Sequence, residues 1–448
     1  MGFEGQTHTV IELVGAGVLW VEDGNHGENR PLAVEFEAVG TPFVRPDDLK
    51  HRVVQFNDCD RINGTALKRV RKGKGRAGDI VFTHRATVGR IARVPLEAPD
   101  FVANPGVTVY RSTQPEVLDP NYLYYFMQGS FFMDQVWAEA GNTDTFPYIS
   151  LTQQRRLKLL LPSIELQRSI GAVLGALDDR ITLLRETNAT LEAIAQALFK
   201  SWFVNFDPVR AKLEGRAPEG MDEATAALFP DSFEETELGV VPRGWRVETL
   251  GSVCSYLNRG ISPKYLEVGG VLVLNQKCIR DFSVDCSKGR RHDPAQRKID
   301  GREVEVGDVL VNSTGVGTLG RVAQLLQLQE RTIVDSHVTV VRAGPGLSWP
   351  YLGQFMTSKQ AEIEAMGEGS TGQTELSRGK LGEMNVLVPD ARTLNAFNEI
   401  VIPLKQRIAT NESSVQTLST LRDTLLPRLI SGQLRLPEAL PLAEDAFT

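Results

Sequence analysis

The amino-acid sequence predicts an α+β protein in which two similar globules are joined by two long helices that form an antiparallel coiled coil. Two observations predict this fold class. The chain contains an internal repeat with an offset of about 230 residues, and each copy ends in a helical heptad pattern. A chain of 448 residues is long enough for two to four domains. The two copies are therefore expected to be related by an approximate twofold axis.

The repeat is clearest in GDIVFTHRATVGRIA (78–92) and GDVLVNSTGVGTLGRVA (307–323). Both contain Gly-Asp, an apolar run, a polar turn and then Gly-Arg-aliphatic-Ala, a pattern called here the Gly-Asp frame. Further matches follow in the same order, and YLYYFM (122–127) agrees with YLGQFM (351–356) at four of six places. LKLLLP (157–162) likewise parallels MNVLVP (384–389). Several matches in one order indicate an internal duplication.

The heptad pattern predicts the two long helices. Apolar residues recur at alternating steps of 4 and 3, which is the a/d spacing of a left-handed coiled coil. The pattern divides the chain into segments, each predicted from the repeat and the heptads: a first globule (1–160), a first central helix (161–205), a linker with a short helix at Glu223 to Leu228 (206–240), a second globule (241–388), a second central helix (389–432) and a C-terminal tail (433–448).

Each heptad seam contains one asparagine, Asn188 and Asn411. An antiparallel pairing in which facing residue numbers sum to 599 brings these two residues together, and a buried amide needs such a partner. In this register Arg422 lies opposite Leu177, with its stem on the seam and its head in solvent. Pro427 is expected to kink or end the second helix.

Each helix of roughly 35 residues would be about 50 Å long at ~1.5 Å per residue. Such a stalk is expected to hold the two globules apart at a fixed distance.

Several function classes are disfavoured by the sequence. No apolar run is long enough to span a membrane, and the four cysteines show no pairing that indicates a metal site. These features predict a cytoplasmic protein with reduced thiols. One GxGxxG stretch occurs at 315–320, but alone it is weak evidence for a dinucleotide, and we interpret it as a flexible turn. We interpret Pro46 to Lys50 as a turn and a short helix start rather than a nuclease motif. We therefore assign no catalytic, cofactor-binding or metal-binding residue.

The globules do contain residues suited to DNA. Although the net charge is −7, basic runs precede both Gly-Asp frames, and lysine and arginine on such loops suit phosphate contacts. The polar turns of the two frames carry side chains that can contact base edges. The DNA-binding candidates are Lys68, Arg69, Arg71, Lys72, Lys74, Arg76, Thr83, His84, Arg85, Lys277, Arg290, Arg291, His292, Asn312, Ser313 and Thr314.

Among these candidates we favour His84 and Arg85 in the first copy, and Asn312 and Ser313 in the second, for base contact, because the copies differ there. Another interpretation stays open, in which the basic runs are solvated loops and the turns only close hairpins.

With these residues in view, the chain resembles the specificity subunits of type I restriction–modification enzymes over nearly its whole length. The most characteristic stretches are LKLLLPSIELQRSIGAVLGALDDRITLLRETNATLEAIAQALFKSWFVNFDPV (157–209) and GMDEATAALFPDSFEETELGVVPRGW (220–245). The resemblance implies a non-catalytic subunit whose two target-recognition domains each bind one half of a split site in double-stranded DNA. It also implies that the coiled coil sets the spacer and docks two modification subunits, with or without two restriction subunits.

The same resemblance implies that S-adenosylmethionine, ATP and Mg²⁺ are bound by partner subunits, which methylate adenine and cleave DNA, and that this chain binds no cofactor. The alternative is a protein–protein scaffold built on the coiled coil without DNA recognition.

Overall fold

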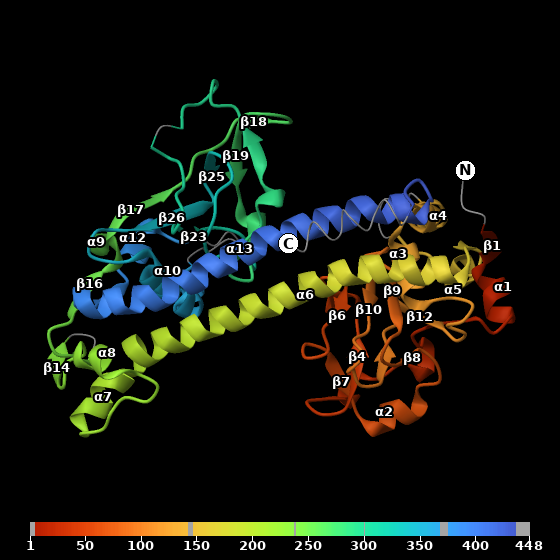
Figure 1. The fold of residues 1–448 in the computed structure, drawn as a ribbon, viewed down its shortest axis with the longest axis horizontal. Helices are drawn as coiled ribbons and strands as arrows, with labels where there is room; N and C mark the ends of the chain where they lie inside the picture. Colours follow the sequence, from red (N-terminus) through yellow and green to blue (C-terminus); the bar gives the residue numbers. More distant parts are fainter. Residues whose placement is uncertain (1–4, 142–146, 237–238, 300, 368–374, 436–448) are drawn as a thin grey trace. The chain divides into compact units, whose positions relative to one another are not determined.

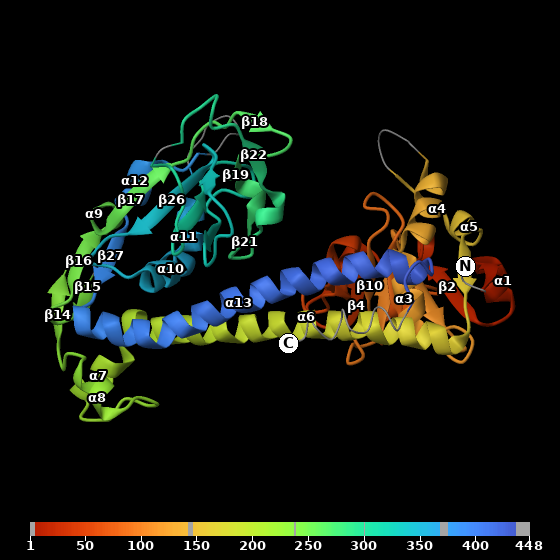
Figure 2. The ribbon, with the colours of Figure 1, turned by 45° about the horizontal axis from the view of Figure 1, so that its top comes forward.

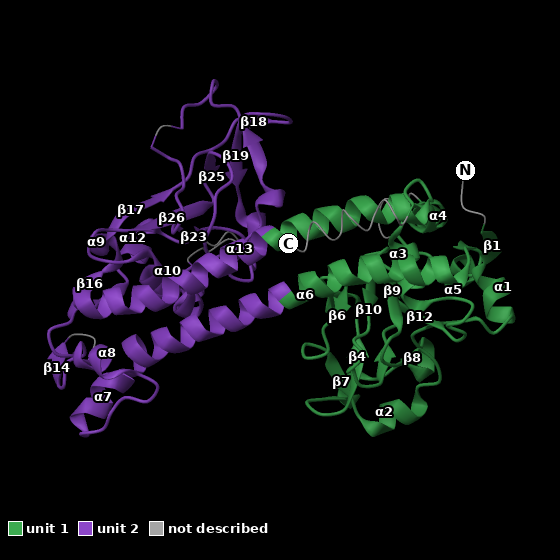
Figure 3. Ribbon diagram, viewed as in Figure 1, with its two compact units in different colours: residues 1–183, 414–448 green, residues 184–413 purple. Residues whose placement is uncertain are grey.

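A computed structural model describes residues 5–141, 147–236, 239–299, 301–367 and 375–435. The chain divides into two compact units, coloured separately in Figure 3. Unit 1 comprises residues 1–183 and 414–448, and unit 2 comprises residues 184–413. Two long helices contribute to both units: α6 (Ile164–Lys200, 37 residues) and α13 (Ala391–Ile430, 40 residues).

Unit 1 contains the strands of the first copy. They are β1 (Gln6–Thr9), β2 (Leu19–Asp23), β3 (Phe36–Glu37), β4 (Thr41–Val44), β5 (Leu49–Lys50), β6 (Val53–Val54), β7 (Asp60–Ile62), β8 (Lys74–Gly75), β9 (Ile80–Thr83), β10 (Ile91–Arg93), β11 (Phe101–Ala103), β12 (Val107–Ser112) and β13 (Lys158–Leu161). Its helices besides the long pair are α1 (Val10–Gly15), α2 (Gly64–Arg69), α3 (Pro120–Gln128), α4 (Ser130–Ala140) and α5 (Leu151–Gln154), with 3-10 turns η1 (Gly27–Asn29), η2 (Ala33–Glu35) and η3 (Pro46–Asp48).

Unit 2 contains the linker and the second copy. Its strands are β14 (Phe233–Thr236), β15 (Gly239–Pro242), β16 (Arg246–Thr249), β17 (Cys254–Arg259), β18 (Tyr265–Leu266), β19 (Val271–Leu274), β20 (Ile279–Arg280), β21 (Ser283–Val284), β22 (Arg290–His292), β23 (Val309–Asn312), β24 (Val322–Gln324), β25 (Thr332–Val334), β26 (Val338–Ala343) and β27 (Asn385–Val388). Its shorter helices are η4 (Ser201–Asn205, a π-helix), α7 (Asp207–Leu213), α8 (Glu223–Ala227), α9 (Leu250–Val253), η5 (Gln276–Cys278), η6 (Cys286–Lys288), α10 (Trp349–Ser358), α11 (Gln360–Ala365) and α12 (Arg378–Gly382).

The strand order of the sheets confirms the internal repeat. In unit 1 the main sheet has the order β2-β12-β9-β10-β6-β5, and in unit 2 the corresponding sheet has the order β17-β26-β23-β24. The second sheets, β3-β7-β4-β11-β8 and β18-β22-β19-β25, share the order of their first four strands, and β8 is an additional edge strand in unit 1. In each of these the pair β4–β11 or β19–β25 is parallel. The α+β fold class with two similar globules is therefore confirmed.

The Gly-Asp frame forms a buried anchor in both copies. The Asp79 carboxylate accepts two hydrogen bonds from the Arg111 guanidinium, at 2.6 and 2.7 Å, and Asp79 is only 1% exposed. In the second copy Arg342 donates to Asp308 at 2.7 and 2.8 Å in the same arrangement. Each arginine also lies over an aromatic ring, Trp20 in unit 1 and Tyr256 in unit 2. The repeated frame is therefore scaffold, because its acidic residue ties two neighbouring strands together.

The long helices pair in the predicted direction and register. Within unit 2, where Figures 1 and 2 show α6 and α13 side by side, the Asn411 side-chain nitrogen donates to the Asn188 side-chain oxygen at 2.7 Å. Asn188 also donates to the backbone oxygen of Ile408 at 3.4 Å. Further along the same helices, Lys405 contacts Glu192 at 2.6 Å. Rising numbers in α6 therefore face falling numbers in α13, as an antiparallel pair requires.

Arg422 differs from the prediction. Its guanidinium does not extend into solvent but contacts the carboxylates of Asp178, at 2.5 Å, and Asp423, at 2.9 Å, and the residue is 7% exposed. Burial opposes the charge of Arg422, yet the two carboxylates raise its pKa overall. A charge on an apolar seam is stabilised by such partners when it cannot reach water.

Helix α13 contains two prolines, and Pro427 does not end the helix as one form of the prediction required. The helix continues to Ile430. Pro403 lies in the interior of the same helix, and the heptad pattern does not mark it.

The linker is anchored to the end of α6 by aromatic packing. The rings of Trp202 and Phe229 meet edge to face with centroids 4.9 Å apart, and Phe203 packs against Trp245. The short helix expected from Glu223 is present as α8. The linker thus belongs to the core of unit 2 and is not a free tether.

Candidate nucleic-acid interface

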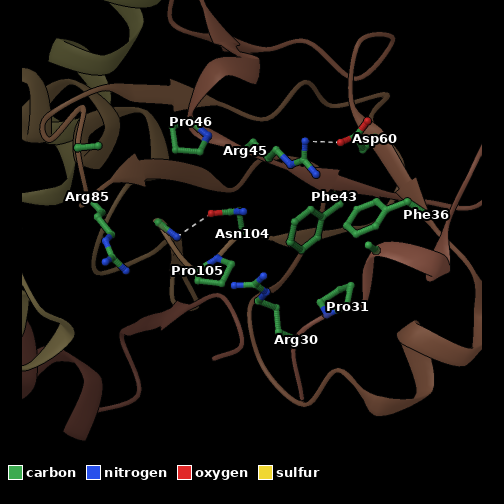
Figure 4. A pocket seen from close by; sticks show the side chains of 13 residues that line it. Arg30, Pro31, Phe36, Phe43, Arg45, Pro46, Asp60, Arg85, Asn104 and Pro105 are labelled. Atoms are coloured by element: carbon green, nitrogen blue, oxygen red, sulfur yellow. Dashed lines mark hydrogen bonds and ion pairs between the residues drawn. The ribbon is translucent and has the colours of Figure 1, made fainter. Parts of the chain in front are cut away.

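A basic hollow opens on unit 1 at the end of strand β9. Its volume is about 930 Å³, and its walls come from the segments after η1, β4, β9 and β11. Figure 4 shows Arg85 and Arg30 on either side of Pro105, with Arg45 and two phenylalanines along another wall. The hollow therefore combines three arginines with apolar surface.

The three arginines have different environments. Arg45 contacts the Asp60 carboxylate and lies over the rings of Phe36, at 5.4 Å, and Phe43, at 5.8 Å. Among the described residues, Arg30 and Arg85 form no ion pair, and both are exposed. Arg45 is thus held in place by protein groups, whereas Arg30 and Arg85 are available to a ligand.

The backbone that carries Arg85 is fixed from two sides. His84 donates its backbone N–H to the Gly106 carbonyl at 3.0 Å, and Ala86 donates to Pro147 at 3.1 Å. Arg85 also forms a β-bridge with Tyr148. Ala86 has a φ of 63°, a left-handed conformation that ends the strand direction abruptly. A free side chain on a fixed backbone is preorganised for recognition.

The corresponding position in unit 2 carries a cluster of hydrogen-bonded polar side chains. Gln276 donates from its side-chain nitrogen to the Thr314 hydroxyl at 2.5 Å, and this hydroxyl lies 2.8 Å from the His337 Nδ1. Thr314 forms a β-bridge with Glu375, as Arg85 does with Tyr148. The same backbone position therefore carries different polar groups in the two copies.

Several predicted base-contacting residues are buried, which corrects the prediction for them. The His84 imidazole is 1% exposed and lies 2.8 Å from the Thr108 hydroxyl, and burial lowers its pKa to about 4. In unit 2, Ser313 makes the equivalent contact with Thr339 at 2.5 Å. The side chains of Thr83, Asn312 and His292 are likewise buried and hydrogen-bonded within the protein. Buried groups with protein partners are not accessible to base edges, so Arg85 and Thr314 are the members of the two turns that remain candidates.

The basic run of unit 1 (68–76) contains some side chains that form ion pairs and others that form none. The Arg69 guanidinium contacts Glu35, and the Lys72 ammonium contacts Asp23, so these two charges are neutralised locally. The Asn25 side chain accepts from the backbone N–H of Arg71, at 2.9 Å, and fixes the loop. In the described part of the chain no ion pair is formed by the remaining members, which are exposed: Lys68, Arg71, Lys74 and Arg76.

The candidates of unit 2 are also mixed. Arg291 forms a bidentate contact with Glu330, at 2.5 and 2.9 Å. Arg290 is exposed and lies over the Tyr265 ring, 3.4 Å from its centroid. Lys277 is exposed in the turn η5, two residues after Asn275. Arg290 and Lys277 therefore stay candidates for phosphate contact.

Other kinds of site find no support in the described residues. The glycines at 315, 317 and 320 all have positive φ and form a turn between β23 and β24, so this GxGxxG stretch does not open a helix. Within the described ranges no cluster of three or more His, Cys, Asp or Glu side chains could hold a metal ion. In the same part of the chain, no helix has the length and apolar character needed to cross a membrane.

Sequence reasoning missed Arg30, Arg45, Gln276 and His337. The repeat offered a signal for two of them, because GTPFVRPDDL and GVLVLNQKCI align Arg45 and the following proline with Asn275 and Gln276. These are positions at which the copies differ within a shared strand-turn pattern. The repeat offers the same kind of signal for His337, because GVTV (106–109) aligns with HVTV (337–340) and the copies differ at the residue before the shared VTV.

Comparison with known proteins agrees with this architecture. The family model described as the type I restriction modification DNA specificity domain matches residues 26–193. The specificity subunit of the type I restriction enzyme HindI from Haemophilus influenzae is 25% identical, over 93% of this chain and 99% of its own length. The MjaIX specificity subunit from Methanocaldococcus jannaschii is 23% identical, over 89% and 87%.

A solved structure shows a similar fold over nearly the whole chain. The crystal structure of a type I restriction–modification S subunit from M. genitalium aligns with 95% of this chain and 96% of its own, with a TM-score of 0.54 at 16% identity. Residues 26–193 therefore match a type I restriction modification DNA specificity domain, and the chain is similar over most of its length to the specificity subunits of type I restriction enzymes.

Proposed function

We propose that this chain is the non-catalytic DNA-recognition subunit of a type I restriction–modification complex, and that it binds a bipartite site with one half-site for each copy of the repeat. The observation that carries the proposal is the pair of equivalent turns after β9 and β23. They share a backbone and a buried Asp–Arg anchor but expose different polar side chains, Arg85 in one and Thr314 with His337 in the other. Two similar scaffolds with different exposed groups suit two different sequences.

The finer parts of the proposal follow the family. We propose that the paired helices dock two modification subunits, with or without two restriction subunits, and that S-adenosylmethionine, ATP and Mg²⁺ are bound by those partners. A cytoplasmic location, where such complexes meet DNA, belongs to the same proposal. The division of the chain at residues 160, 205, 240, 388 and 432 stays a prediction.

Methylation of the host genome tests the proposal. Single-molecule sequencing of a strain with the gene, a strain without it and a complemented strain is expected to show one bipartite methylated-adenine motif that is lost on deletion and restored on complementation. An unchanged set of methylated motifs would contradict the proposal. If the assembled complex instead bound all DNA sequences equally, the alternative of a scaffold without DNA recognition would be favoured.

A further inference from the structure

Two pairs of residues occupy equivalent backbone positions in the copies. The His84 N–H donates to the Gly106 carbonyl at 3.0 Å, and the Ser313 N–H donates to the His337 carbonyl at 2.8 Å. The side chains of Asn104 and Asp335 accept from the N–H groups of Gly106 and His337, both at 2.9 Å. Position 85 therefore corresponds to 314, and position 106 corresponds to 337. We call the pair Arg85 and Gly106 the recognition corner of unit 1, and the pair Thr314 and His337 the recognition corner of unit 2.

The two recognition corners exchange a large side chain for a small one. In unit 1 the arginine at position 85 stands beside a glycine, and a Cβ added to Gly106 would lie 3.7 Å from the Arg85 Cβ. In unit 2 the small Thr314 stands beside the exposed His337, and their side chains lie 2.8 Å apart. Each corner thus carries one long polar side chain, placed on opposite members of the pair.

We propose that Arg85 and His337 are the specificity-determining residues of the two half-sites, and that Arg85 selects guanine. This inference rests on the proposed function. In the major groove, guanine presents two acceptors, O6 and N7, and an arginine fork donates to both. The Arg85 fork has no acceptor of its own and no carboxylate partner among the described residues. Arg45 does not compete for this role, because Asp60 already holds it.

The hydrogen-bond chain of unit 2 sets the chemistry of His337. The Gln276 nitrogen donates to the Thr314 hydroxyl oxygen, and within this inference we assign the hydroxyl proton to the contact with the His337 Nδ1. This assigns Nδ1 as an acceptor and leaves the proton on Nε2, an assignment made from the hydrogen-bond network. A single N–H donor matches the N7 acceptor of a purine, so His337 is expected to favour a purine over a pyrimidine carrying a donor at that position, namely cytosine.

Binding of the assembled complex to a pool of randomised DNA duplexes tests the inference. The wild-type complex is expected to select guanine at one position of one half-site. Arg85→Ala should accept all four bases at that position, with a loss of about 5- to 150-fold for the preferred site, the range expected for one bidentate contact. His337→Ala should relax one position of the other half-site only. Arg85→Lys keeps the charge but loses the fork, so it should also lose the guanine preference.

The most specific test replaces the recognition corner of unit 1 with the residues of the unit 2 corner. Gly106 does not have a positive φ, so it can accept a side chain. The triple variant Arg85→Thr, Gly106→His and Pro46→Gln copies the whole chain of unit 2 and should accept either purine at the first half-site, where wild type selects guanine alone. Lys68→Ala, an exposed cation of the basic run, is the matched control and should weaken binding to every sequence alike.

The outcomes separate the two levels of inference. If Arg85→Ala weakened binding to all sequences equally and lowered the salt dependence, Arg85 would contact phosphate and the inference would be overturned. The same holds if the Arg85→Ala motif were unchanged. If the wild-type complex itself showed no preferred sequence, the proposed function would fail before this inference was reached.

Discussion

The buried imidazole of His84 makes the stability of unit 1 depend on pH. His84 lies against the Thr108 hydroxyl and is 1% exposed, and burial lowers its pKa from 6.5 to about 4 although Asp23 acts in the opposite direction. The unfolded chain therefore takes up a proton near pH 6.5, whereas the folded chain takes it up only near pH 4. Between these values the unfolded state binds more protons, so stability falls as the pH falls.

The size of the effect follows from the two pKa values. Between pH 7 and pH 5, a shift from 6.5 to about 4 removes about 2 kcal/mol from the free energy of unfolding. The second copy supplies the control, because Ser313 stands at the equivalent position and bonds to Thr339. The variant His84→Ser copies that arrangement and carries no titrating group. Urea unfolding of wild type and His84→Ser at both pH values should show that the variant loses about 2 kcal/mol less on acidification.

Other titrating groups cancel in this comparison, because both proteins contain them. The reasoning would be refuted if wild type and His84→Ser lost the same free energy between pH 7 and pH 5. That result would mean that the folded protein admits water or a proton to His84, and that burial does not hold it neutral.

Three further predictions concern the scaffold and the DNA contacts. Asp79→Ala leaves Arg111 without its bidentate partner and should cost about 3–5 kcal/mol in urea unfolding, while the preferred DNA sequence stays the same; a changed sequence preference at unchanged stability would contradict the scaffold role. Asn411→Ala leaves Asn188 without its side-chain partner and should lower the unfolding free energy by about 1–3 kcal/mol, and a double-mutant cycle with Asn188→Ala that shows no coupling would argue against the pair. Arg71→Ala should weaken binding to all DNA and reduce the salt slope by about 1, measured by titration at several salt concentrations; an altered base preference would rule out a phosphate contact.

The register of the long helices could be predicted from the sequence because it depends only on the order of residues along each helix. The heptad step fixes which face of each helix is apolar, and one polar residue on each seam leaves a single alignment in which both amides have a partner. The contact between Asn188 and Asn411 follows from these two facts. The fate of Arg422 did not follow, because Asp178 lies next to the seam rather than on it and heptad positions alone do not show that it reaches across.

The base-contacting turn was harder to place because strand β9 is buried on both faces. All four residues from Ile80 to Thr83 are buried, so the strand shows no alternation that would mark an exposed face. The sequence therefore could not show where exposure resumes. In the structure the boundary falls between His84 and Arg85, where the backbone leaves the strand and Ala86 takes a positive φ.

A difference between repeats identifies a recognition site only when burial is known. His84 and Ser313 differ between the copies, yet both are buried and both bond a threonine of the neighbouring strand, so this difference is an exchange of one internal partner for another. Gly106 and His337 also differ, and there the larger residue is exposed. The buried difference changes how the stability of one unit depends on pH, and the exposed difference changes the groups offered to a ligand. The His84→Ser variant should therefore alter folding stability, whereas His337→Ala should alter the preferred DNA sequence.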